Sequence, residues 1–148
     1  MERSSVRMRT KEVASFVSRA SGETSVLARV GPRRHHPPLL NSFALEQEWP
    51  TPVLDLVRDG GARLVLQLRR GRILPRDGEE RMAWAEEVLQ RAEEAGLPGR
   101  HLLLDPVLLP WGEDLAAGEG LLECIDGARG RWPDTSTLVG LSNVSWGV

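Results

Sequence analysis

Hydrophobic positions follow two periods in turn along the chain. Short apolar runs of strand length alternate with longer stretches in which apolar residues recur every three or four positions, as on one face of a helix. The runs predicted as strands are 25–30, 39–43, 63–68, 102–104 and 138–141. This alternation predicts an α/β fold with about five parallel strands joined by helices.

The helical pattern is clearest in the middle of the chain. Asp77 and Glu80 have the spacing of a capping box, and Gly96 with Pro98 ends the pattern. The apolar positions between them share one helix face: Met82, Ala85, Val88, Leu89, Ala92 and Ala95. Weaker helical patterns cover residues 10–22, 50–61 and 115–128.

Composition narrows the class of protein. With 148 residues, 41% hydrophobic and 27% charged, the chain is expected to form one globular domain, residues 1–148. Its apolar runs are far shorter than the ~20 residues of a membrane-spanning helix, and a net charge of −2 gives no reason to expect nucleic acid. The single cysteine, Cys124, excludes an intramolecular disulfide and fits a reducing cytoplasm. The adjacent His35 and His36 lack further ligands at a helical offset, so no metal site is expected.

Polar residues follow the apolar residues of three predicted strands: Asn41-Ser42 follows Leu39-Leu40, Asp105-Pro106 follows 102–104, and Ser142-Asn143 follows 138–141. Because the carboxyl ends of parallel strands meet at one edge of a sheet, we expect these side chains to converge. An ionised Asp accepts hydrogen bonds and an Asn amide both donates and accepts, so the set suits a planar heterocycle with amino and carbonyl groups. The alternative is that each residue is a helix cap or turn former.

Three motifs carry a family resemblance. They are Leu39-Leu40-Asn41-Ser42 with Glu46, Leu104-Asp105-Pro106 with Leu108-Leu109-Pro110, and Val139-Gly140-Leu141-Ser142-Asn143-Val144-Ser145 with Gly147. Together with the middle helix they resemble the pterin-binding barrel of the methyltetrahydrofolate:corrinoid methyltransferases and of cobalamin-dependent methionine synthase. The third motif is the most specific, because dihydropteroate synthases, which are similar in fold, have Arg-Lys in place of Asn143-Val144. The match covers residues 39–147 well and residues 1–38 poorly.

The resemblance implies a TIM (β/α) barrel that moves a methyl group from methyltetrahydrofolate to the cobalt of cobalamin or another corrinoid, carried by a partner protein. The departing ring nitrogen is a poor leaving group unless a proton or a strengthening hydrogen bond reaches it. By resemblance, Asn143 is the catalytic residue that supplies this hydrogen bond. Asp105 and Asn41 would hold the pyrimidine edge of the pterin, and Gly140 and Ser142 would shape the floor around Asn143.

The chain departs from the family in length and in one motif. A full (β/α)₈ barrel takes ~250 residues, and the first two strands and the last strand of the family pattern have no counterpart here. We therefore expect an incomplete barrel, and a homodimer or a complementing chain as a further partner. Arg69-Arg70 also stands where the family often has acidic residues. The alternative function is a truncated, non-catalytic pterin-binding or interaction module of the same fold.

Overall fold

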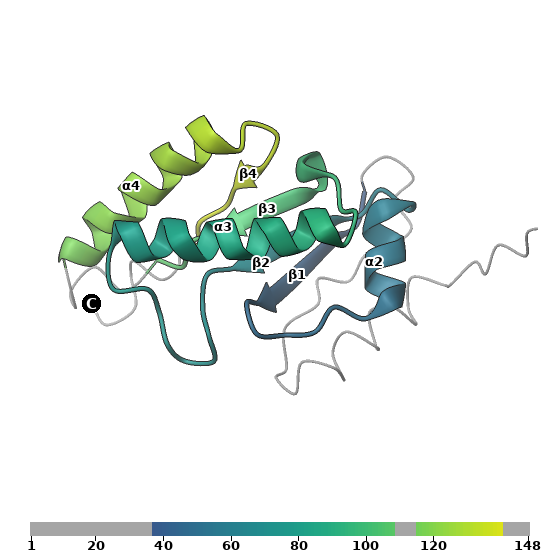
Figure 1. Ribbon diagram of the computed structural model, residues 1–148, viewed down its shortest axis with the longest axis horizontal. Helices are drawn as coiled ribbons and strands as arrows, with labels where there is room; N and C mark the ends of the chain where they lie inside the picture. Colours follow the sequence, from purple (N-terminus) through teal and green to yellow (C-terminus); the bar gives the residue numbers. More distant parts are fainter. Residues whose placement is uncertain (1–36, 109–114, 141–148) are drawn as a thin grey trace, which may run out of the picture.

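The computed structural model describes residues 37–108 and 115–140. Four strands and three helices alternate along them (Figure 1). The elements are β1 (Leu39–Ala44), α2 (Thr51–Arg58), β2 (Arg63–Gln67), α3 (Gly78–Glu94), a short 3-10 helix (Gly99–His101), β3 (Leu102–Asp105), α4 (Leu115–Arg131) and β4 (Ser136–Thr137). The strands form one parallel sheet in the order β1-β2-β3-β4. The predicted α/β class with a parallel sheet is confirmed.

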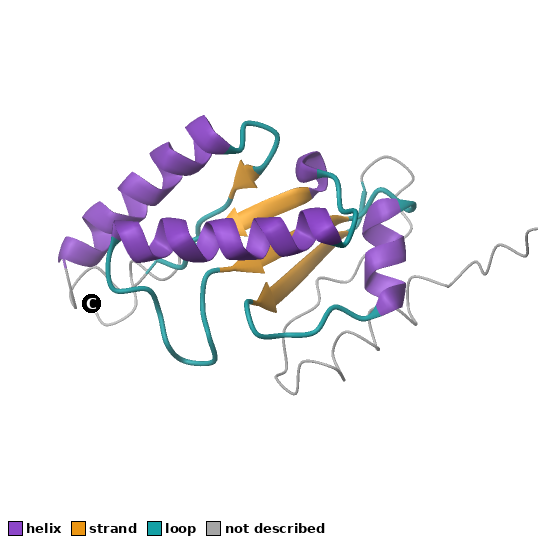
Figure 2. Cartoon of the chain, viewed as in Figure 1, coloured by secondary structure: helices purple, strands orange, loops and turns teal. Residues whose placement is uncertain are grey.

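The hydrophobic core lies on one face of this sheet. Alternate residues of β2 and β3 belong to it: Leu64, Leu66, Leu102 and Leu104, followed by Leu68 just after β2. The helices contribute Val53 and Val57 of α2, Ala85, Val88, Leu89 and Ala92 of α3, and Cys124 and Ala128 of α4. All three described helices therefore pack against the same face, and Figure 2 shows α3 lying across the strands.

The intervening strand residues point to the opposite face, because side chains alternate along a strand. On β2 and β3 these residues are Arg63, Val65, Gln67, Leu103 and Asp105. We call the face that carries them the second face. Its two apolar members are buried, with Val65 exposed by 0% and Leu103 by 6%.

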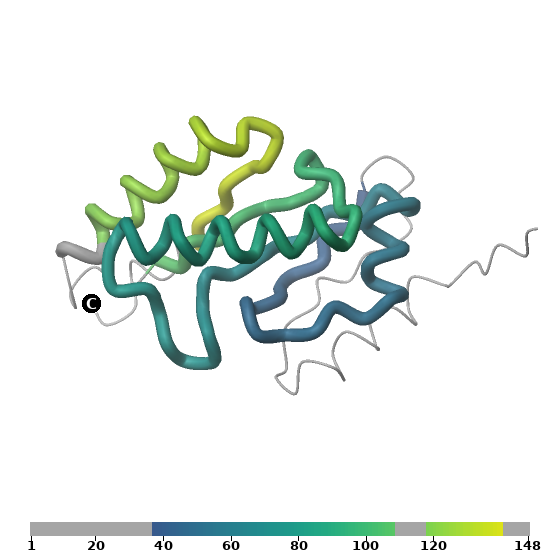
Figure 3. The backbone as a smooth tube through the Cα atoms, in the orientation of Figure 1, coloured from purple at the N-terminus to yellow at the C-terminus, as the bar shows by residue number. Residues whose placement is uncertain are grey.

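Glycine permits the close approach of α3 and α4. A Cβ atom added at Gly120 would lie 2.8 Å from the backbone nitrogen of Gly78, so a larger residue at position 120 would push the two helices apart. The helices are close at their amino-terminal ends and diverge toward their carboxyl ends (Figure 3).

The predicted helices and strands of the described part are confirmed except for the last strand. That strand was expected at 138–141, but β4 is formed by Ser136–Thr137. A turn in which the nitrogen of Thr135 donates to the carbonyl of Trp132 at 3.0 Å brings the chain beside β3 earlier than the apolar run indicates. Leu138 still donates to the carbonyl of Leu104 at 2.9 Å.

Two further predicted elements, the helix at 10–22 and the strand at 25–30, lie outside the described residues. Among the helices in the described ranges, none combines the length and apolarity needed to cross a membrane.

Candidate functional site

The best-formed polar group at the carboxyl edge of the sheet joins β2 and β3. Gln67 and Asp105 are the last residues of these strands and are Cα partners across the parallel pair. The side-chain amide of Gln67 donates to Oδ2 of Asp105 at 3.1 Å. Asp105 is 8% exposed, so its carboxylate is held at the rim of the second face with little access to water.

The local sequence after β3 fixes the carboxylate. Pro106 has no N–H with which to continue the ladder, and the chain turns so that the backbone nitrogen of Val107 donates to Oδ1 of Asp105 at 3.0 Å. This is an Asx turn, in which a side chain replaces a backbone acceptor. The carbonyl of Asp105 accepts from the nitrogen of Leu68 at 2.9 Å. Side chain and main chain of Asp105 are therefore both anchored.

Asp105 retains the capacity to bind a ligand. An ionised carboxylate offers about four acceptor sites, and the two hydrogen bonds to Gln67 and Val107 occupy two of them. Both donors are uncharged amides. The remaining acceptor sites suit a group that presents two neighbouring N–H bonds, as the edge of an amino-substituted heterocycle does.

Arg69 orients the amide of Gln67. The Nε of Arg69 donates to Oε1 of Gln67 at 2.9 Å, and its Nη1 donates to the carbonyl of Gly71 at 2.8 Å. With Oε1 committed to the guanidinium, the amide nitrogen of Gln67 faces Asp105. Arg69, Gln67 and Asp105 thus form one chain of hydrogen bonds, in which the amide of Gln67 links the guanidinium to the carboxylate.

Gln67 was missed in the sequence because it lies inside the predicted apolar strand 63–68 rather than after it. The alternation of side chains along a strand could have identified it. Gln67 is two residues from Val65, so it lies on the second face, at the carboxyl end of β2.

Asn41 lies within β1, as in the predicted strand 39–43, and not at the carboxyl end of the strand where its convergence with Asp105 was expected. The register shifts between Leu40 and Phe43, leaving Asn41 and Ser42 opposite the single residue Val65. Asn41 is exposed, and by alternation from Leu40 it points to the second face. Two strand spacings and two residues along a strand place its Cα about 12 Å from that of Asp105.

The remaining predicted site residues are at the end of the chain. Gly140 follows β4, is exposed and is the last residue of the described range. Ser142 and Asn143 lie outside the described residues. The structure therefore brings Asp105 together with Gln67 and places Asn41 on the same face.

A buried arginine lies beneath the turn that follows β3. Arg81 of α3 is 1% exposed, and its Nη1 donates to the carbonyl of Pro106 at 2.5 Å. Burial lowers the pKa of its guanidinium below the ordinary value, while the neighbouring Cys124 and Asp77 oppose this shift. Burial raises the pKa of the Cys124 thiol, and the charge of Arg81 partly offsets the rise.

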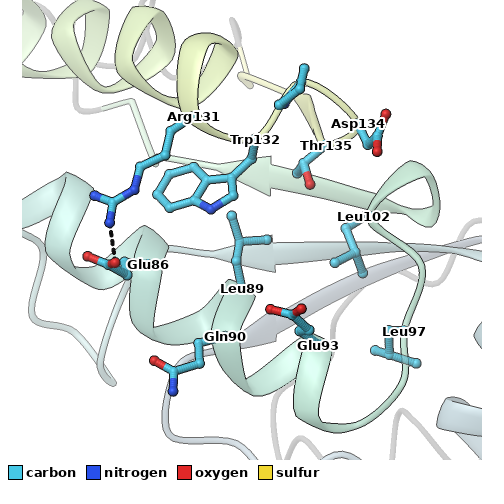
Figure 4. A pocket seen from close by; sticks show the side chains of 12 residues that line it. Glu86, Leu89, Gln90, Glu93, Leu97, Leu102, Arg131, Trp132, Asp134 and Thr135 are labelled. Atoms are coloured by element: carbon cyan, nitrogen blue, oxygen red, sulfur yellow. Dashed lines mark hydrogen bonds and ion pairs between the residues drawn. The ribbon is translucent and has the colours of Figure 1, made fainter.

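A groove of about 700 Å³ lies at the opposite end of the sheet, between the diverging ends of α3 and α4 (Figure 4). Leu89, Leu97, Leu102 and Trp132 contribute apolar side chains, and an ion pair between Arg131 and Glu86 spans it. Leu102 is the first residue of β3 whereas Asp105 is the last, so this groove is separate from the polar group described above.

Within residues 37–108 and 115–140, no three His, Cys, Asp or Glu side chains are grouped so that they could hold an ion.

A comparison of the chain with protein-family models found no match. The roles proposed for Asp105, Gln67 and Asn41 therefore depend on their geometry and on the motif resemblance.

Proposed function

We propose that the chain binds methyltetrahydrofolate at the carboxyl edge of β1, β2 and β3 and transfers its methyl group to the cobalt of a corrinoid held by a partner protein. The observation that carries the proposal is the carboxylate of Asp105. It is nearly buried at the end of a parallel strand, fixed by two amide donors, and has acceptor sites left for a ligand.

The topology supports a barrel as the setting of this site. Consecutive parallel strands with every described helix on one face are typical of a (β/α)₈ barrel, whereas a doubly wound sheet has helices on both faces. We infer that the sheet is part of such a barrel and that the second face lines its interior. Active sites of these barrels lie at the carboxyl ends of the strands, where Asp105 and Gln67 are.

The chemistry of a pterin fits the donors and acceptors present. Its pyrimidine ring presents a ring N–H beside an amino group, and a carboxylate can accept both hydrogen bonds at once. Asn41 can donate to and accept from the neighbouring ring atoms. Gln67, by fixing Oδ2 of Asp105, holds the carboxylate plane in one orientation for this contact.

The proposed reaction is a methyl transfer that needs no additional oxidant or reductant. The reduced cobalt attacks the methyl carbon, the bond from that carbon to the pterin nitrogen breaks, and its electron pair stays on the nitrogen, which takes up a proton. The resemblance alone assigns Asn143 the hydrogen bond to this nitrogen. A cytoplasmic location and a second copy or other chain that completes the barrel stay predictions.

Calorimetric titration with methyltetrahydrofolate tests the binding step. Asp105→Asn keeps the size of the side chain but replaces an acceptor oxygen by a donor, so we expect affinity to fall at least about tenfold. Asp126→Asn, at an exposed position of α4, is the matched control and should bind as the unaltered chain does. Absence of binding by the unaltered chain, or equal affinity in Asp105→Asn, would overturn the proposal.

Transfer of the methyl group to reduced free cobalamin separates enzyme from binding module. We expect Asn143→Ala to bind methyltetrahydrofolate and to lose transfer. The non-catalytic alternative is favoured by one observation, the Arg69 guanidinium linked to Asp105 through Gln67 at an edge where the family often has acidic residues. Binding without transfer by the unaltered chain would establish that alternative.

A further inference from the structure

Arg81 is a buried cation without an ion pair among the described residues. Its Nη1 contacts the carbonyl oxygens of Pro106 at 2.5 Å and Val107 at 3.5 Å, and its Nε is buried with no hydrogen-bond partner. Cys124 packs nearby in the core. An apolar side chain of similar volume would fill this space without the cost of burying a charge, so packing alone does not explain an arginine here.

The residue that Arg81 contacts has an unusual backbone. Val107 has φ of 57°, the left-handed region that β-branched residues rarely adopt. Its N–H is the group that holds Oδ1 of Asp105. The guanidinium thus binds the carbonyl side of the same short turn whose amide side fixes the carboxylate.

We propose that Arg81 is a positioning residue for Asp105. The carbonyl of Pro106 and the N–H of Val107 belong to one planar peptide unit, so by binding this carbonyl Arg81 keeps the Val107 N–H directed at the carboxylate. Its contact with the carbonyl of Val107 helps to hold the left-handed conformation of that residue. The consequence for ligand affinity rests on the proposed function, but the effect on the turn does not. The contact therefore links α3, which packs on the core face of the sheet, to a carboxylate on the second face.

Hydrogen exchange tests the effect on the turn without any ligand. In Arg81→Met the Val107 amide should exchange at least about tenfold faster, while the ladder amides of β2 and β3 keep their rates. Arg81→Lys retains the charge but not the planar fork, so its rate should be intermediate, and this variant serves if Arg81→Met does not fold. An unchanged Val107 rate in the folded variants would overturn the proposal.

A double-mutant cycle tests the effect on affinity. Glycine adopts positive φ without strain, so in a Val107→Gly background the turn depends less on Arg81. We expect Arg81→Met to weaken methyltetrahydrofolate binding about tenfold alone and less than about twofold in that background. Equal factors in both backgrounds would contradict the proposal. Arg100→Met, at an exposed position, is the control.

The two measurements separate the two proposals. If the unaltered chain binds no methyltetrahydrofolate, the proposed function fails, and the exchange rate of Val107 still decides the role of Arg81.

Discussion

The side-chain amide of Gln67 donates to Oδ2 of Asp105 at 3.1 Å, from the last residue of β2 to the last residue of β3. The parallel register makes the two residues partners, and the parity of both strands puts them on the second face. Because Arg69 occupies the carbonyl oxygen of Gln67, the amide has one orientation. The hydrogen bonds of Gln67 and Val107 therefore hold the carboxylate of Asp105 in one orientation.

Gln67→Glu should weaken methyltetrahydrofolate binding. Two neighbouring carboxylates disfavour ionisation of each other, and the new carboxylate also removes the donor to Oδ2. We expect affinity about tenfold lower at pH 8, with a smaller loss at lower pH as one carboxyl is protonated. Calorimetry across pH measures this. Gln90→Glu on the exposed side of α3 should bind normally, and an equal loss there would contradict the interpretation.

Alkaline pH should destabilise the fold through Cys124. Burial raises the pKa of this thiol above its ordinary 9.0, so the unfolded state loses the proton first as pH rises. The stabilisation is complete below that value and is lost as pH increases toward the folded pKa, with a slope of up to about 1.4 kcal/mol per pH unit. Urea unfolding at pH 8 to 10 should show this decline in the unaltered chain. Cys124→Ala should lack the contribution, and identical slopes would contradict it.

Asp77→Ala should destabilise the chain by about 1 kcal/mol. Oδ1 of Asp77 accepts the N–H of Glu80 at 2.8 Å, as an N-cap does. In a capping box the carboxylate of Glu80 would accept from the backbone nitrogen of Asp77. Here it accepts from the backbone nitrogen of Arg76, one residue earlier, at 2.7 Å. Urea unfolding followed by circular dichroism measures the loss. Glu79→Ala in the same turn should change stability by only a few tenths of a kcal/mol.

Arg91→Met should loosen the connection between β1 and α2. The guanidinium donates to the carbonyls of Leu45 at 2.7 Å and Gln47 at 2.6 Å, and it lies 4.3 Å from the ring centre of Trp49. Loss of these contacts should lower the free energy of unfolding by about 2 kcal/mol.

Arg91→Lys should not restore that stability, because one ammonium lacks the planar fork that reaches both carbonyls. Arg129→Met, exposed in the last turn of α4, is the control. Equal stability of Arg91→Met and Arg129→Met in urea unfolding would contradict the interpretation.

Local patterns predicted the elements well where the pattern was strong. The capping residue Asp77 and the glycine at 96 bracket α3 in the sequence and in the structure. The end of the sheet was harder, because Ser136–Thr137 has no apolar pattern and is a strand only through its pairing with β3. A pairing of this kind depends on a turn and a partner that the strand's own residues do not encode.

The residues of the candidate site also differ in how far the sequence could predict them. Asp105 could be identified because it follows an apolar run, and its position at a strand end depends on neighbouring residues alone. Gln67 looked like part of a hydrophobic strand, and Arg81 looked like one of many charged residues on the polar side of a helix. Their roles become visible only when the register and the packing of α3 are known.

By itself, the sequence determined the alternation of strands and helices and the placement of a carboxylate at the end of the third described strand, since both follow from interactions between residues close in the chain. Only the tertiary structure decided which side chains share the second face, that Gln67 meets Asp105, and that Arg81 is buried beneath Val107. These relationships join segments about 25 to 40 residues apart, and they depend on strand register and on which helix covers which face of the sheet.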